Sequence, residues 1–352
     1  MKQTIIVALM ALLLLAACAQ EQTALNEPIT VGVMLPLTGP HAVPGEEARQ
    51  GVELALEEVG DRIKVTYEDH AGDTKKAVAG FSKLVDVDGV NFVLTSQSWI
   101  SNGVYPLAAD KGVWQGAVFS TAFKRTRDAD NAVLFTSKVD EDAPFLASYA
   151  QRFDRVGLMY LNNDFGKVWY DNLRALLGEK LVAAEAYDAA DPDTGTQLSK
   201  IKATNPDLLI ILGSGNEGGL VARKARELGI NAQFAGMFGL QQKGFIVDPA
   251  AVEGTVYTYP FIDDKHPLVA TYTQRNGVPP TTYTAELYDA IITLAQATND
   301  CGEDPACVKN WYRNKQLPGA LGASRFDEKG EVHRVFEYRQ VKDGKFVTYE
   351  GD

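Results

Sequence analysis

The sequence predicts an α/β protein with two lobes, and three observations indicate this fold class. From residue 29 onward, short apolar, β-rich runs alternate with amphipathic stretches of helical period, which is typical of a parallel sheet covered on both faces. The alternation restarts after a transition around Ser137–Asp142, and two separate series imply two lobes rather than one continuous sheet. The chain of 352 residues is long enough for two domains.

The first series begins with Ile29–Leu35 (ITVGVML), a β-rich apolar run that is followed by the turn residues 36–40. Gly45–Val59 comes next, with apolar side chains at helical spacing and acidic residues toward its start. The same reasoning predicts the remaining elements of this series. Strands are expected at Ile63–Tyr67, Asn91–Leu94 and Val113–Phe119, and helices at Thr74–Val85 and Ile100–Lys111.

The second series has the same alternation, and its most apolar run is DLLIIL at 207–212. Strands are expected at Arg155–Leu161, Leu181–Tyr187, Asp207–Leu212 and Ala232–Ala235, and helices at Phe165–Leu177, Thr194–Ala203 and Glu217–Leu228.

A long amphipathic helix (Tyr283–Thr298) and a strand-rich tail (Arg325–Tyr349) follow both series. Such late elements commonly return to complete earlier lobes, so we expect more than one crossover. Lobe 1 is expected to contain residues 29–138 and 263–328, and lobe 2 residues 139–262 and 329–352.

The N-terminus carries the features of an export signal. Lys2 precedes an uninterrupted apolar run from Ile5 to Leu15, which is too short to span a membrane. Leu15-Ala16-Ala17-Cys18 resembles the lipobox of bacterial lipoproteins, in which the signal is cut before a cysteine that carries lipid. We therefore expect a signal peptide at 1–17, a lipidated tether at 18–28 and a protein exported to the cell envelope on a lipid anchor at Cys18. The alternative is an ordinary signal peptide with an incidental cysteine.

The formal net charge is −12. An acidic surface argues against a nucleic-acid partner and against electrostatic docking on anionic lipid. Contact with a membrane is therefore expected only through the lipid anchor.

The other two cysteines, Cys301 and Cys307, enclose a short loop that contains Gly and Pro. Their spacing is not CxxC, and no second pair or nearby His completes a zinc site. In an exported chain the natural interpretation is a disulfide, and the alternative is two free thiols.

Signals for catalysis are weak. Gly213–Gly218 matches GxGxxG, but it lies in the middle of the chain, and Glu217 would meet a pyrophosphate with its own negative charge. The four His residues are scattered, and neither HExxH nor GxSxG is present. We expect no enzyme, metal or cofactor, and a hydrolase or dehydrogenase is only the third hypothesis.

Two hydroxyl clusters give a more specific signal. Thr95-Ser96-Gln97-Ser98 and Ser120-Thr121 each follow a predicted strand, and open α/β sheets bind ligands at the carboxyl ends of their parallel strands. Ser98 lies near a helix N-terminus, where free N–H groups and the helix dipole favour a carboxylate. The alternative is simple helix capping by Ser98 and a turn at Thr121.

Five segments in order also carry a family pattern: VGVMLPLTGP (31–40) with Gly45 and GVELA (51–55), VTYEDHAGDTKKAV (65–78), RVGLMYLNNDFGK (155–167), VARKARELGINAQFAG (221–236) and GASRFDEKGEV (322–332). With them the chain resembles the branched-chain amino-acid (Leu/Ile/Val) binding proteins of ABC importers, a type I periplasmic binding protein family. The resemblance covers nearly all of the chain beyond the signal. It implies two Rossmann-like lobes joined by hinge strands, a Venus-flytrap that encloses its ligand between the lobes.

The resemblance also implies a binding site. Ser98 and Thr121 fall where hydroxyls hold the ligand carboxylate, with the backbone of Phe119 beside them. Phe165 falls where amino-acid binders usually carry Tyr, and Ser214 where another aromatic often lies. Phe238 falls where they place the acid that binds the α-ammonium group.

The departure at Phe238 leaves two ligand hypotheses open. A buried ammonium group without a carboxylate partner would cost several kcal/mol, so the pattern favours an apolar or aromatic acid that lacks an amine, in a pocket that includes Trp99. The alternative is that Glu217 or Asp164 supplies the acid and that the ligand is an amino acid.

The leading functional hypothesis is therefore the solute-binding protein of an ABC importer, with a small carboxylate as ligand and the permease and ATPase subunits as partners. We expect a monomer. The alternative is an envelope lipoprotein of the same fold that regulates cell-wall enzymes or acts as a sensor. Ala19 lacks the Asp that retains many lipoproteins in the inner membrane, so either membrane is compatible with the anchor.

Overall fold

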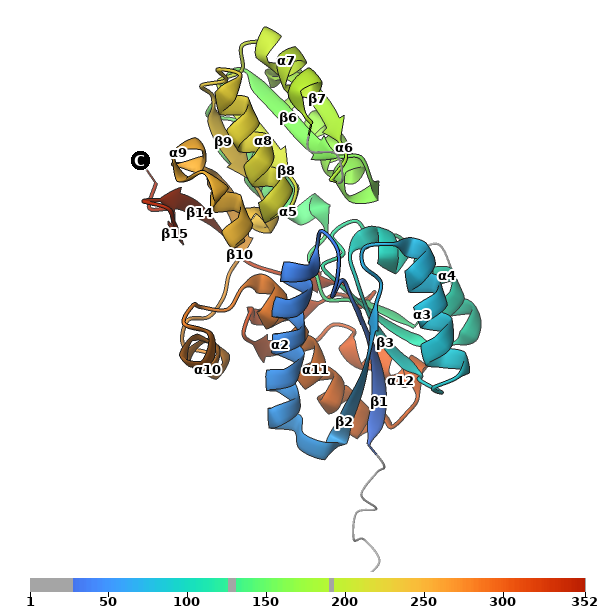
Figure 1. Ribbon diagram of the computed structural model, residues 1–352. Helices are drawn as coiled ribbons and strands as arrows, with labels where there is room; N and C mark the ends of the chain where they lie inside the picture. Colours follow the sequence, from blue (N-terminus) through green and yellow to red (C-terminus); the bar gives the residue numbers. More distant parts are fainter. Residues whose placement is uncertain (1–27, 126–130, 190–192, 352) are drawn as a thin grey trace, which may run out of the picture.

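The computed structural model describes residues 28–125, 131–189 and 193–351. The expected signal peptide, the lipidation site Cys18 and nearly all of the tether lie outside these described residues. Within them, no helix combines the length and the apolar character needed to cross a membrane. The described chain forms two lobes, which Figure 1 shows one above the other.

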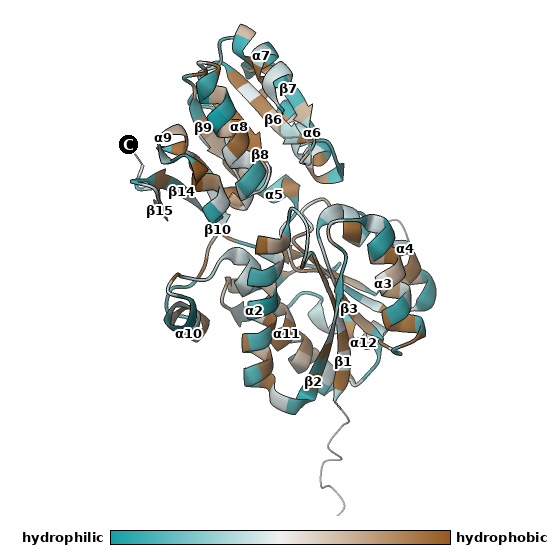
Figure 2. Cartoon of the chain, in the orientation of Figure 1, coloured by the Kyte–Doolittle hydropathy of each residue, from teal (hydrophilic) through white to brown (hydrophobic). Residues whose placement is uncertain are grey.

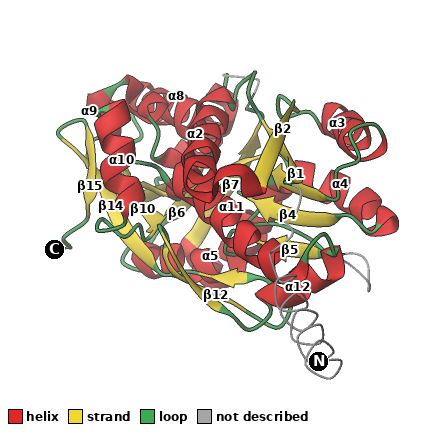
Figure 3. Ribbon diagram, turned by 90° about the horizontal axis from the view of Figure 1, so that it is seen from below, coloured by secondary structure: helices red, strands yellow, loops and turns green. Residues whose placement is uncertain are grey.

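Lobe 1 contains a five-stranded parallel sheet with the strand order β2-β1-β3-β4-β5. Helices α3 and α4 pack on one face of this sheet, and α2, α11 and α12 pack on the other (Figures 1 and 3). The strands are β1 (Ile29–Leu35), β2 (Ile63–Asp69), β3 (Phe92–Ser96), β4 (Trp114–Val118) and β5 (Ala132–Leu134), and the helices are α2 (Ala42–Val59), α3 (Thr74–Asp86), α4 (Ser98–Lys111), α11 (Thr282–Cys301) and α12 (Pro305–Tyr312).

Strand β1 illustrates why a doubly covered sheet forms from this sequence. Val33 and Leu35 are buried in the cluster that includes side chains of α2 and α11, whereas Met34 is buried on the other side with side chains of α3 and α4. Because neighbouring side chains of a strand point to opposite faces, a continuous apolar run is stable only where both faces are covered. Figure 2 shows the resulting pattern, with apolar central strands and polar outer helix surfaces.

Lobe 2 contains a seven-stranded sheet with the order β15-β14-β10-β9-β8-β6-β7, parallel except at β14 and β15. Its strands are β6 (Val156–Leu161), β7 (Leu181–Tyr187), β8 (Leu208–Leu212), β9 (Gln233–Gly236), β10 (Val256–Pro260), β14 (Phe336–Lys342) and β15 (Lys345–Thr348). The helices of this lobe are α5 (Val139–Ala150), α6 (Asp164–Leu177), α7 (Gly195–Ala203), α8 (Gly215–Glu227) and α9 (Pro249–Val252), with short 3-10 turns at Phe238–Leu240 (η3) and Lys243–Val247 (η4).

Within the described residues the chain passes between the lobes at three places, after β5, after β10 and before β14. After β10 it forms α10 (Pro267–Asn276) and α11, and α11 packs along α2 in lobe 1. A three-stranded antiparallel sheet, β11 (Gln316–Gly319), β12 (Gly322–Phe326) and β13 (Val332–His333), is attached to β5 through a Leu134–Glu331 bridge. The final crossing then delivers β14 to the sheet of lobe 2.

The predicted fold class is confirmed, and most predicted elements are found within a few residues of their expected ends. The elements that the sequence pattern did not indicate include β5, α5, β10, α10 and α12. Helix α5 contains Pro144 and an acidic first turn, and because proline normally ends a helix, its pattern indicates only a transition. Strand β10 (VYTYP) is buried on both faces and ends in a proline, so it shows no alternation.

The predicted disulfide is also confirmed. Cys301 ends α11 and Cys307 lies in α12, and the two are bonded with their Cα atoms 5.6 Å apart. Asp304 caps α12 by accepting from the N–H groups of Ala306 and Cys307. The bridge therefore fixes the corner between the two helices, at the end of α11 that lies away from the other lobe (Figure 1).

The close packing of α2 on α11 depends on Gly51, and Gly51→Ala should destabilise the protein. An added Cβ would lie 2.1 Å from the backbone oxygen of Thr284, and a helix backbone cannot move away as a flexible side chain can. We expect the free energy of unfolding to fall by about 1–3 kcal/mol, measured by urea denaturation. The matched control is Gly80→Ala on α3, where the new Cβ meets only the Glu68 side chain at 3.3 Å. This control should be neutral or stabilising by up to about 1 kcal/mol, and equal effects of the two variants would contradict the account.

Candidate ligand-binding site

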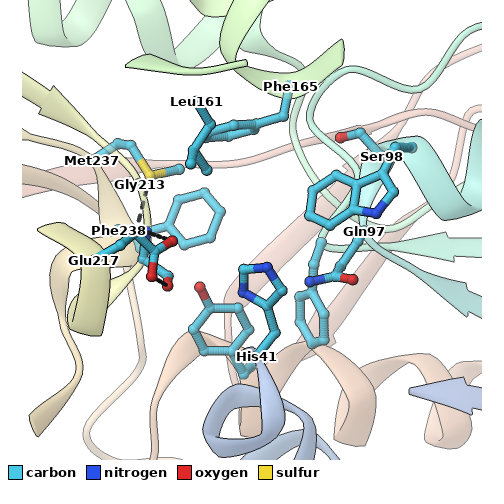
Figure 4. Close-up of a pocket in the computed structure, with 14 residues that line it drawn as sticks. His41, Gln97, Ser98, Leu161, Phe165, Gly213, Glu217, Met237 and Phe238 are labelled. Atoms are coloured by element: carbon cyan, nitrogen blue, oxygen red, sulfur yellow. Dashed lines mark hydrogen bonds between the residues drawn. The ribbon is translucent and has the colours of Figure 1, made fainter. Parts of the chain in front are cut away.

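A cavity lies between the two lobes, at the carboxyl ends of strands of both parallel sheets (Figure 4). It encloses about 530 Å³ of empty space, the part open to solvent included. The lining residues are His41, Gln97, Ser98, Trp99, Phe119, Leu161, Phe165, Gly213, Ser214, Glu217, Met237, Phe238, Gly239 and Tyr283.

Aromatic rings make up much of the wall. Tyr283, at the start of α11, packs edge-on against Phe119 with ring centroids 4.8 Å apart. The centroid of the Phe238 ring lies 6.0 Å from that of the Tyr283 ring. Phe165, in the first turn of α6, packs beside the buried Trp169. Because these rings come from both lobes, the cavity can surround an apolar group when the lobes approach each other.

The polar wall of lobe 1 is the N-terminus of α4. Gln97 precedes the helix with φ 71°, and its side chain does not cap the helix. Its Oε1 atom is buried and has no hydrogen-bond partner among the described residues. Ser98 Oγ accepts from the Ala122 N–H at 3.2 Å. An uncapped helix N-terminus with a neighbouring hydroxyl and amide is suited to a ligand carboxylate.

The polar wall of lobe 2 is the N-terminus of α8, which is capped from within. Ser214 and Glu217 form a capping box, in which the Glu217 carboxylate accepts from the Ser214 N–H at 2.9 Å and from the Ser214 hydroxyl. The residue Glu217 is only 8 % exposed. No cation forms an ion pair with it in the described part of the chain.

His41 is the other ionisable side chain on the wall, and it comes from lobe 1, just before α2. Burial lowers its pKa below the ordinary histidine value, although the Glu217 charge acts in the opposite direction. Burial therefore favours the neutral form of His41, which does not compensate the Glu217 charge. In Figure 4, Glu217 and Ser98 lie on opposite sides of the cavity.

The structure brings six of the seven predicted ligand residues to this cavity: Ser98, Trp99, Phe119, Phe165, Ser214 and Phe238. Thr121 instead lines a neighbouring hollow with Lys138 and Val168. Within the part of the chain that the structure describes, its buried Oγ1 atom has no hydrogen-bond partner. The N–H of Phe119 is donated to Glu286 at 2.8 Å, so Phe119 offers its ring to the cavity and not this donor.

Of the two alternative acids, Glu217 lines the cavity, whereas Asp164 lines a wider opening beside Asn163 and Asp188. Sequence reasoning did not single out His41, Met237 and Tyr283 as site residues. Tyr283 follows a long connection from β10, and nothing local in its sequence indicates the neighbour that it meets. Gln97 lies inside the predicted hydroxyl cluster, so its position could have been inferred there.

Two α/β lobes that enclose a cavity between the carboxyl ends of their strands define a bilobal ligand-binding protein. The chain belongs to the periplasmic binding protein family, because residues 28–345 match the model of the family described as "Periplasmic binding protein". Members of this family are ligand-binding receptors of ABC-type transport, which deliver small molecules to permeases and are not enzymes.

Individual proteins agree with this assignment. The Leu/Ile/Val-binding protein BraC3 of Rhizobium johnstonii is 28% identical over 345 residues, which cover 92% of this chain and 94% of that protein. An extracellular ligand binding receptor from Desulfohalobium retbaense has a solved structure that superposes with a TM-score of 0.87 at 30% identity. The match covers 92% of this chain but only 59% of that one.

Two more distant solved structures contain ligands and share the fold. A branched-chain amino acid transporter substrate binding protein from Streptococcus pneumoniae, in complex with isoleucine, has a TM-score of 0.81 at 21% identity, with 91% of this chain and 97% of that chain covered. A solute binding protein from R. palustris, in complex with benzoate, has a TM-score of 0.83 at 16% identity, with coverage of 91% and 95%.

Proposed function

We propose that this protein captures an amino acid with an apolar side chain for an ABC importer. The observation that carries the proposal is the Glu217 carboxylate, which lines the cavity at 8 % exposure without a cation partner among the described residues. Closing the lobes removes further water from this carboxylate. That step costs several kcal/mol unless the ligand brings a positive charge, and an α-ammonium group supplies it.

An amino acid also carries an α-carboxylate, and this negative group needs a binding site of its own. The N-terminus of α8 is already occupied by Glu217, whereas the N-terminus of α4 has no side-chain cap. The α-carboxylate is therefore expected at α4, beside Ser98 and the Gln97 amide. The oxygen of this amide has no hydrogen-bond partner in the described ranges, and the amide can turn its NH2 group toward the ligand. A zwitterion in this orientation bridges the lobes, and the rings of Phe119, Phe165 and Phe238 surround its side chain.

An amine-free aromatic or aliphatic acid is the second candidate. It is favoured by Phe238, an apolar side chain where amino-acid binders of the family carry an acid, and by the two hydrogen bonds that Glu217 already accepts from Ser214. The benzoate-bound relative of the same fold is compatible with this candidate.

Thermal shift with matched pairs separates the two candidates. The purified protein is tested with L-leucine against 4-methylpentanoate and with L-phenylalanine against 3-phenylpropanoate, with benzoate in addition. A ligand at about 100 times its Kd adds about 2.7 kcal/mol of stability. We expect stabilisation by the amino acid of at least one pair and not by its deaminated partner. The reverse order would favour the second candidate, and a flat response to every compound would favour a regulatory or sensory role.

Affinity for the amino acid should fall as the pH becomes acidic. A bound ammonium group neutralises Glu217, which removes the charge that raises the His41 pKa, so binding lowers that pKa further and releases a proton. Affinity is therefore full above the His41 pKa of the free protein and decreases below it, by at most about tenfold per pH unit.

Titration calorimetry between about pH 8 and about pH 5 measures this effect. The nearby His70 does not interfere, because burial lowers its pKa to about 4. His41→Asn should flatten the profile, and an affinity that rises toward acid would contradict the assignment.

We also propose that the chain is exported and held in the envelope by lipid on Cys18, as a monomer. We keep the lobe limits expected from the sequence, except that the last segment of lobe 2 begins near β14 and not at residue 329, because β13 pairs with β12 in the sheet attached to lobe 1. The lipobox-like sequence before Cys18 supports the anchor, and the family assignment supports the compartment.

A further inference from the structure

Phe119 has an unusual backbone conformation for an aromatic residue. It directly follows β4 and has φ 51°, in the left-handed region, where a bulky side chain is strained. The conformation has a consequence for the cavity, because the half-buried Phe119 ring forms part of its wall, 4.8 Å from the ring of Tyr283. Something must hold the backbone in this state.

Glu286 provides the contact that holds it. The Phe119 N–H donates to Glu286 Oε1 at 2.8 Å, across 167 residues of sequence. The Thr136 hydroxyl also donates to Glu286 Oε1. Thr136 Oγ1 in turn accepts from the Ser120 N–H at 3.1 Å. Two successive amides after β4 are thus fixed by one carboxylate and one hydroxyl. Glu286 is 3 % exposed, so water does not compete freely for these bonds.

Glu286 and Tyr283 lie three residues apart on α11 and therefore face the same side of this helix. One turn of α11 consequently supplies both the ring on which Phe119 packs and the acceptor for its amide. Burial raises the pKa of Glu286 to about 7, although the charge of the half-buried Arg334 lowers it. The contact therefore needs an acceptor oxygen more than a full negative charge.

We propose that Glu286 is a positioning residue that shapes the ligand cavity by holding Phe119 in its left-handed conformation. Its relevance to specificity rests on the proposed function, but the contact itself does not. Without Glu286, the Phe119 backbone should relax to negative φ, and the ring should leave Tyr283. The cavity would then lose one of its aromatic walls, although Glu286 itself does not line the cavity.

The test uses Glu286→Leu, which removes the acceptor, and Glu286→Gln, which keeps a side-chain oxygen. The matched control is Asp289→Asn on the same helix. Asp289 is also buried and accepts from two backbone amides, Ala320 at 2.7 Å and Leu321 at 3.0 Å, whereas the Phe119 amide donates to Glu286. The control therefore reports the effect of losing a buried carboxylate in general.

The first readout needs no ligand. Crystal structures of the unliganded variants and hydrogen exchange of the Phe119 amide are compared with those of the wild type. In Glu286→Leu we expect a negative φ at Phe119, a ring displaced from Tyr283 and amide exchange faster by about tenfold or more relative to neighbouring core amides. Glu286→Gln and Asp289→Asn should keep the wild-type geometry. A left-handed Phe119 still packed on Tyr283 in Glu286→Leu would overturn the proposal.

If Glu286→Leu does not fold, hydrogen exchange in the wild-type protein decides the question. A Phe119 amide that exchanges as slowly as the core amides of β4 supports the proposal that Glu286 fixes this amide. Exchange at the rate of an exposed loop overturns the proposal. The second readout is the affinity ratio of L-leucine to benzoate, which should change in Glu286→Leu and not in Asp289→Asn. Failure of both compounds to bind wild type would count against the proposed function, and the first readout would still decide on Glu286.

Discussion

Glu217→Gln should weaken binding of the preferred amino acid by about two orders of magnitude and leave the free energy of unfolding nearly unchanged. Removing one partner of a buried charge pair costs about 2–5 kcal/mol, and about 2.8 kcal/mol corresponds to a hundredfold change in Kd. Glutamine has the same shape, and it serves equally well at the third position of a capping box. The glutamine oxygen can still accept from the Ser214 N–H, and its NH2 group can donate to the Ser214 hydroxyl oxygen, so both contacts persist while the charge is lost.

The control for this substitution is binding of the deaminated analogue, which has no ammonium group to lose. Glu217→Gln should leave its weak affinity unchanged or raise it, because a less polar wall then faces an anionic ligand. Calorimetry measures Kd, and urea denaturation measures stability. If the amino acid bound Glu217→Gln as tightly as wild type, Glu217 would not be the ammonium partner.

Ser98→Asp should abolish binding, with a loss of about a thousandfold or more, while the α4 helix is maintained. The new carboxylate would lie where the ligand carboxylate is expected, and like charges placed together cost several kcal/mol. An acidic residue in the first turn interacts favourably with the helix dipole. It can also accept from the Ala122 N–H, as the serine hydroxyl does at 3.2 Å. Binding and stability should therefore respond differently to the substitution.

Ser98→Ala is the milder companion variant. It removes one hydroxyl and changes no charge. We therefore expect affinity to fall by about tenfold, in keeping with the loss of one hydrogen bond to a charged group. Equal affinities of wild type and Ser98→Asp, measured by calorimetry at the same pH, would show that the ligand carboxylate does not lie at α4.

Local patterns in the sequence are sufficient for most of this fold. Ile29–Leu35 forms β1 with the predicted bounds, because an apolar run between turn signals has few other stable conformations. The pairing of β10 with β14 could not be predicted in the same way. It depends on two segments some 80 residues apart in sequence, and nothing in either segment indicates its partner.

The site was predictable only in part, for a similar reason. Ser98 and Phe165 lie at the starts of helices that come within a few residues of the ends of β3 and β6, so the topology alone brings them to the ligand edge of each sheet. The acid that faces the cavity could not be inferred. Asp164 lies in the first turn of α6 and Glu217 in the first turn of α8, and the sequence does not show which of these two turns points to the ligand. The amide of Phe119 is bonded to Glu286, 167 residues away, and no local pattern reveals that contact.

Calorimetry on a thermodynamic cycle tests the central claim most directly. The amino acid that most stabilises the protein and its deaminated analogue are each titrated into wild type and into Glu217→Gln. If Glu217 binds the α-ammonium group, wild type should prefer the amino acid by about a hundredfold or more, and this preference should disappear in Glu217→Gln. The same preference in both proteins, or a wild-type preference for the analogue, would contradict the claim.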